Sequence, residues 1–92
     1  MEEKRKLFHE ILDLVLDING FEKRDKNTTG DKPTVFLDIY GHTADIAVLI
    51  HDNGWVPDAD PDFRGMAYFD RSSDGLKNLA SELKRKKEEL NV

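Results

Sequence analysis

The stretch TVFLDIYGHTADIAVLIHD, residues 34–52, constrains the fold more than any other part of the chain. Apolar residues take alternate positions on both sides of GHTA, residues 41–44, and this is the pattern of a β-hairpin. If Tyr40 lies opposite Asp45, six aliphatic side chains share one face of the sheet. The six are Val35, Leu37, Ile39, Ile46, Val48 and Ile50. Since a slip of one residue would move all of them to the other face, burial fixes this register.

The N-terminal segment has helical periodicity instead. Apolar side chains recur at three- to four-residue spacing through residues 2–18, and Asn19-Gly20 is a typical end of a helix. Leu12 and Leu16 widen the apolar stripe beyond what one sheet needs. The helix therefore either packs deeply or contributes to a second interface, such as that of a homodimer.

Three further segments complete the expected order of elements. FEKRDK, residues 21–26, has charges at alternate positions, which is typical of a protected edge strand. MAYFD, residues 66–70, predicts a last strand, and Ser72-Ser73-Asp74 predicts the start of a second helix. We therefore expect one α+β domain over residues 1–92, in the order α-β-β-β-β-α. Its sheet would be four-stranded and antiparallel, with three long strands and a short one, and both helices would pack on one face.

The charge of the chain is concentrated in its middle. The net charge is -5, and between Asn27 and Gly75 the acidic residues are nine aspartates, against three lysines or arginines. Such a surface repels polyanions and attracts cations or basic proteins. The absence of cysteine excludes disulfide scaffolds and Cys-based zinc sites. Acidic residues interrupt every apolar run, so we expect neither a signal peptide nor a membrane partner, and a soluble, cytoplasmic protein.

The segment HDNGWVPDADPDFRG, residues 51–65, is long for a loop without internal periodicity, and such loops are often functional. Trp55 would serve either as an anchor for a partner or as part of a lid over the edge of the core. Asp58, Asp60 and Asp62 alternate as in a calcium loop, but the glycine and glutamate that an EF-hand needs are missing. A weak divalent-cation site therefore remains only as a second alternative.

Catalytic chemistry has little support in the sequence. His51 and Asp38 are the best acid–base candidates, as a diagonal pair on adjacent strands, but such pairs are usually structural. No nucleophile with an attached base and no glycine-rich phosphate loop is found. We therefore expect a protein that is not an enzyme and has no cofactor or metal.

A helix, three strands and a helix in succession are similar to the element order of double-stranded RNA-binding domains. This resemblance implies phosphate binding at the start of the second helix, where this chain has Asp74 rather than a basic cluster. The basic run, Lys84–Lys87, lies at the opposite end of that helix. Nucleic-acid binding is therefore kept as the first alternative, although the charge pattern disfavours it.

The sequence favours a small binding or accessory module that engages a basic protein partner through an acidic, aromatic-bearing surface of sheet and loop. The chain is similar in size and acidity to small accessory proteins of bacteria, phages and mobile elements. The expected contact residues are Phe36, Asp38, Tyr40, Trp55, Asp58, Asp60 and Asp62.

Overall fold

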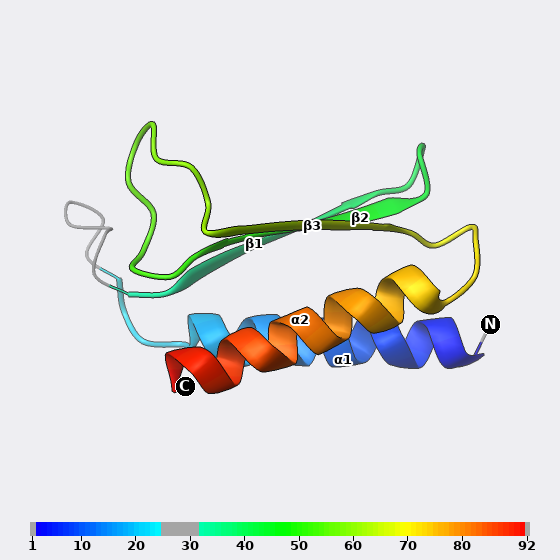
Figure 1. Cartoon of the computed structure of the whole chain (residues 1–92), viewed down its shortest axis with the longest axis horizontal. Helices are drawn as coiled ribbons and strands as arrows, with labels where there is room; N and C mark the ends of the chain where they lie inside the picture. The colour runs from blue at the N-terminus through cyan, green and yellow to red at the C-terminus, as the bar shows by residue number, and fades with distance from the viewer. Residues whose placement is uncertain (1, 25–31, 92) are drawn as a thin grey trace.

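The computed structural model describes residues 2–24 and 32–91, and in these residues two helices pack against a three-stranded antiparallel sheet. The elements are α1 (Glu2–Asn19), β1 (Thr34–Tyr40), β2 (Asp45–His51), β3 (Phe63–Tyr68) and α2 (Asp74–Leu90). The sheet order is β1-β2-β3. Both helices lie on one face of the sheet and leave the other face uncovered by helices (Figure 1).

The predicted hairpin register is confirmed. Tyr40 lies opposite Asp45 and Ile39 lies opposite Ile46, and the remaining residues of the two strands pair in the same register. The side chains of β2 that face the helices are completely buried, whereas Ile39 on the outer strand β1 is 59% exposed. The cover that the helices provide therefore does not reach the outer end of β1.

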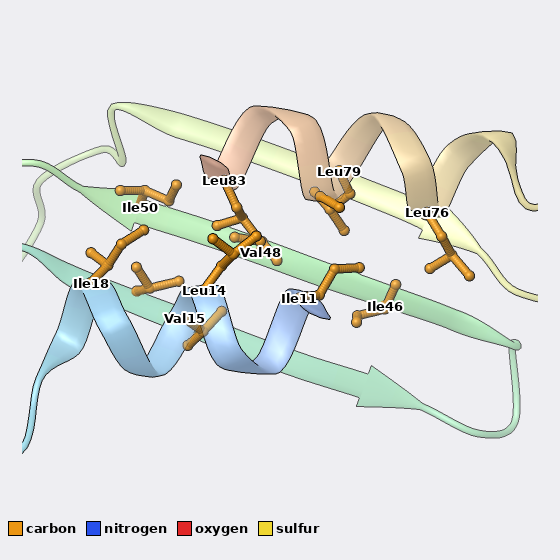
Figure 2. Close-up of a cluster of buried hydrophobic side chains, with 13 residues drawn as sticks. Ile11, Leu14, Val15, Ile18, Ile46, Val48, Ile50, Leu76, Leu79 and Leu83 are labelled. Carbon is orange, nitrogen blue, oxygen red and sulfur yellow. The ribbon is translucent and has the colours of Figure 1, made fainter. Parts of the chain in front are cut away.

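The core lies between the sheet and the two helices, as Figure 2 shows. The apolar stripes of α1 and α2 both point toward β2, which is the central strand. The most deeply buried large side chains are Ile11, Ile46, Ile50, Leu76, Leu83 and Val48. In the described parts of the chain, neither helix is long and apolar enough to cross a membrane.

The predicted four-stranded sheet is wrong, because the described sheet has three strands. Of the segment expected to form a short strand, residues 21–24 have no strand structure and residues 25–26 lie outside the described residues. At the start of β1, the Asn19 side chain takes the position of a neighbouring strand. Its amide nitrogen donates to the carbonyl of Val35 at 3.1 Å, and its amide oxygen accepts from the backbone N–H of Val35 at 2.7 Å.

Arg24 holds the connection between α1 and β1 without a strand ladder. Its guanidinium donates to the backbone carbonyls of Asn19 at 2.7 Å and Pro33 at 2.9 Å. It also donates to the hydroxyl of Thr34 at 3.0 Å. A side chain therefore satisfies carbonyls that strand pairing would otherwise have used.

The last strand spans Phe63–Tyr68 rather than the predicted 66–70. Gly65 lies opposite Val48 on the face that packs against α2. A methyl group built on Gly65 would lie 2.8 Å from Leu79 Cδ1 and 2.9 Å from the ring of Phe63. Glycine at this position therefore allows β3 and α2 to approach closely.

Replacing Gly65 by alanine is expected to lower the free energy of unfolding by about 1–3 kcal/mol, because the added methyl overfills a packed contact. Gly41→Ala is the matched control, since no atom lies within 4 Å of the added methyl there. We expect the control to change stability by less than about 0.5 kcal/mol. Urea denaturation followed by circular dichroism measures both, and equal effects would contradict the close approach.

Candidate binding surface

The sheet face opposite the helices, here called the open face, carries a cluster of aromatic and apolar side chains. The register aligns them in rows across the three strands. Tyr40 is 42% exposed, Met66 is 56% exposed, and Phe36 and Tyr68 are similarly accessible. The residues of the open face are Thr34, Phe36, Asp38, Tyr40, Asp45, Ala47, Leu49, His51, Arg64, Met66 and Tyr68, of which Asp45 and His51 are buried. A small domain rarely presents several aromatic side chains on one uncovered face without a binding role.

Two loops border the open face. The loop of residues 52–62 rises from one end of the sheet, and the turn of residues 41–44 bends in the same direction at the other end (Figure 1). Both turn away from the helix layer. The open face is therefore the floor of a shallow surface with a raised segment at each end.

Three polar contacts that involve Asp52 or Asp62 help to close the base of the 52–62 loop. The ammonium of Lys86 on α2 lies 2.8 Å from both carboxylate oxygens of Asp52. The backbone N–H of Asp52 donates to the carboxylate of Asp62 at 2.6 Å, and the N–H of Asp62 donates to the carbonyl of Ile50 at 2.7 Å. The loop thus leaves and rejoins the sheet at a fixed point. The carboxylate of Asp62 serves this closure.

Lys86 is unusual in this chain because it is a buried cation, with 6% of its surface exposed. Burial by itself lowers the pKa of its ammonium group, but the hydrogen bonds and charges of Asp52 and Glu89 outweigh that effect. The pKa of Lys86 is therefore raised above its ordinary value. The lysine is therefore charged at neutral pH, and its ion pair with Asp52 attaches the base of the loop to α2.

Inside the loop, Pro57 and Asp58 form a tight turn. The N–H of Ala59 donates to the carbonyl of Val56 at 3.3 Å, and Asp58 has a φ of +64°. Aspartate tolerates this left-handed conformation better than most residues, and proline favours the preceding position. The turn presents the side chain of Asp58 to solvent, and Asp60 is also exposed.

Trp55 lines an open cavity of about 430 Å³ at the start of β1. Phe36 and Phe21 contribute two further aromatic walls, and Phe21 is 86% exposed. The remaining lining residues are Asn19, Gly20, Glu22, Arg24 and Thr34. Trp55 and Phe36 therefore belong to one continuous surface, although they come from a loop and a strand.

The structure brings most of the expected contact residues together. Phe36, Asp38 and Tyr40 lie on the open face, and Trp55 joins them through the shared cavity. The expected contact residues did not include Met66 and Tyr68 on β3, although Tyr68 was considered as a base-stacking aromatic for the nucleic-acid alternative. They also did not include Arg71, whose guanidinium carbon lies 4.3 Å from the centre of the Tyr68 ring. The alternating pattern of MAYF, residues 66–69, could have indicated that Met66 and Tyr68 point to the same face of the sheet.

The hypothesis that His51 and Asp38 form a diagonal pair is wrong. Asp38 lies opposite Ala47, whereas His51 lies opposite Thr34, four residues further along β2. His51 is buried, and its ring meets that of Phe36 edge-on with centroids 5.8 Å apart. In the described residues, no three His, Asp or Glu side chains converge as a metal site would require.

The basic run of α2 is not a free patch. Lys86 is buried against Asp52, Lys87 lies 2.9 Å from Asp17, and Arg85 contacts two glutamates of its own helix. Three of the four cations in this run are therefore paired with carboxylates. These pairings leave few cations of the run available to phosphates, on which nucleic-acid binding relies. The element order that motivated the nucleic-acid alternative, a helix, three strands and a helix, is the order observed.

Comparison of the chain with known protein families, with curated proteins and with solved structures gave no match.

Proposed function

We propose that the protein is a small non-enzymatic binding module whose open face and 52–62 loop engage a basic protein partner. The observation that carries the proposal is the uncovered sheet face with its exposed aromatic side chains, bordered by the loop that carries Trp55. Aromatic side chains supply much of the binding energy at protein interfaces. Their faces also attract the cationic groups of lysine and arginine.

The preference for a basic partner comes from the carboxylates beside those aromatic residues. Asp38 is exposed in the middle of β1, and Asp58 and Asp60 are exposed on the loop. Arg64 and Arg71, whose guanidinium lies over the ring of Tyr68, are the basic residues at the open face. Carboxylates around an aromatic surface select for a partner of opposite charge and speed its approach.

Neutralising three of these carboxylates together is expected to weaken partner binding about tenfold or more, because each exposed charge contributes up to about 1 kcal/mol. The variant is Asp38→Asn, Asp58→Asn and Asp60→Asn, and asparagine also tolerates the left-handed turn at position 58. The measurement is affinity capture from a lysate of the source organism, followed by titration calorimetry with the partner so identified.

The matched control changes the net charge by the same amount on the helix layer. Its three sites are exposed residues of α1 and α2. The substitutions are Glu10→Gln, Asp13→Asn and Glu88→Gln. We expect the control to bind as the wild type does. Equal binding by both triple variants, or equal loss in both, would contradict a partner site on the open face.

A further inference from the structure

We propose that two copies of the chain associate by antiparallel pairing of their β1 strands, with Ile39 of each copy at the two-fold axis. β1 is an outer strand of the described sheet, since the order is β1-β2-β3. An outer strand presents a row of backbone N–H and C=O groups that can pair with a strand of another chain. This inference does not depend on the proposed basic partner, because it concerns the edge of the sheet rather than its open face.

The contacts of Asn19 show which backbone groups of β1 point outward. Asn19 bonds both the N–H and the C=O of Val35, so these two groups point away from β2. In an antiparallel sheet the direction alternates from residue to residue. The backbone groups of Leu37 and Ile39 therefore also point outward. Since Asn19 already satisfies Val35, the second half of β1 is the part of this edge that a partner strand can use.

Exposed aliphatic side chains flank that half of the strand. Ile39 is 59% exposed on the helix side of the sheet, and Leu12 of α1 is 46% exposed. Leu12 lies two helical turns before Asn19 and hence on the same side of α1, about 10 Å along its axis. Ile39 lies about 13 Å along β1 from Val35. The end of α1 and the start of β1 lie at the same end of the molecule (Figure 1). From these lengths, Leu12 and Ile39 flank the same stretch of edge.

The sequence of this edge is complementary to itself. Pairing centred on Ile39 sets Ile39 against Ile39 of the second copy and Leu37 against its Gly41. It uses the outward-pointing backbone groups of Leu37 and Ile39, which pair with no other strand of the described sheet, and it leaves the bonds between Asn19 and Val35 intact. On the open face, each Asp38 comes to lie opposite Tyr40 of the other copy, so no like charges face one another. Pairing centred on Leu37 would instead displace the Asn19 amide.

In this arrangement the three-stranded sheets join into one, and directly paired residues point to the same side of it. The helices of both copies therefore lie on one face. The two open faces are continuous on the other. Exposed apolar residues at an unpaired edge promote association. A two-fold dimer uses the β1 edge of both copies at once, so the same edge cannot add further copies and build a fibre.

A single introduced cysteine tests the position of the axis, because the chain has no cysteine of its own. Residues paired as Ile39 is with its symmetry mate have Cα atoms about 5.5 Å apart, which suits a disulfide. We expect Ile39→Cys to give most of the protein as a disulfide-linked dimer, about twice the 10.6 kDa of the chain, under mild oxidation. Met66→Cys is the control, since Met66 is 56% exposed on the other outer strand, β3. Equal cross-linking of the two variants would overturn the proposal.

Light scattering during size-exclusion chromatography provides the second measurement. The wild type is expected to elute as a dimer at high protein concentration. Ile39→Lys should elute as a monomer with an unchanged circular dichroism spectrum, because two ammonium groups would meet at the axis. A wild type that stays monomeric at every soluble concentration, or a dimer that survives Ile39→Lys, would show that β1 is not the interface.

Discussion

Replacing Ile46 by alanine is expected to lower the free energy of unfolding by about 2–5 kcal/mol, whereas the same change at Ile39 is expected to cost less than about 1 kcal/mol. The two isoleucines lie directly opposite each other on the hairpin and point to the same face. Ile46 is fully buried under the helices, and Ile39 is 59% exposed. Alanine at position 46 removes apolar contacts and leaves a cavity, but alanine at position 39 removes little that is buried.

Chemical denaturation of both variants, monitored by the fluorescence of Trp55, measures this difference. Similar losses at the two positions would mean that the helices cover the whole hairpin, contrary to the fold described above. The titration is repeated at several protein concentrations. A contribution of Ile39 that grows with concentration belongs to the association of two copies rather than to the fold of one.

The second large effect is expected from Asp52→Ala, which removes the main partner of the buried Lys86. We expect a loss of about 2–3 kcal/mol, less than for a fully buried pair because the side chain of Asp52 is 22% exposed. Arg85→Ala is the control, since its two ion pairs on the same helix are exposed and should contribute less than about 1 kcal/mol.

Adding Lys86→Met to Asp52→Ala should restore much of the stability, because the double variant no longer buries an unpaired cation. Double-variant denaturation curves provide the measurement. If the double variant is as unstable as the sum of the single changes, the two residues do not act as a pair.

The pair also makes a specific pH dependence expected. Because the pKa of Lys86 is raised in the folded protein, its contribution is fully present below the pKa of an unfolded lysine, about 10.4, and is lost as the pH rises through the folded value. The stability difference between the wild type and Lys86→Met should thus stay constant from neutral pH to about pH 10 and shrink above it.

The hairpin could be predicted residue by residue because burial on one face leaves only one acceptable register. The same alternation placed Phe36, Asp38 and Tyr40 together on the opposite face. The fourth strand could not be judged in this way. The side-chain amide of Asn19 bonds the N–H and C=O of Val35, the groups that a fourth strand would have paired with at that position. An asparagine at the end of a helix gives no sign of this role in the sequence.

The long-range contacts of the 52–62 loop could not be predicted from the sequence either. A lysine in a run of cations is typical of a solvated helix face, yet Lys86 is buried because the fold brings Asp52 against it, 34 residues earlier in the chain. Similarly, the stretch Ser72-Ser73-Asp74 was expected to supply the cap of α2, but the side chain of Ser73, the N-cap residue, makes no cap hydrogen bond and its hydroxyl donates to Glu3 instead. Both depend on tertiary neighbours, which local patterns do not specify.

The closed base of the 52–62 loop has a consequence for how such a protein can change over time. The contacts at the base use Asp52, Asp62 and Lys86 together with the backbone of Ile50, and Gly54 adds a backbone hydrogen bond to the carbonyl of His51 at 3.2 Å. None of these contacts uses residues 55 to 61. Those seven positions can therefore be substituted, or the segment lengthened at small entropic cost, while the sheet underneath keeps its stability. The sheet and helices thus form a frame whose stability does not depend on residues 55–61, and this suits the scaffold to displaying chosen peptides in that segment.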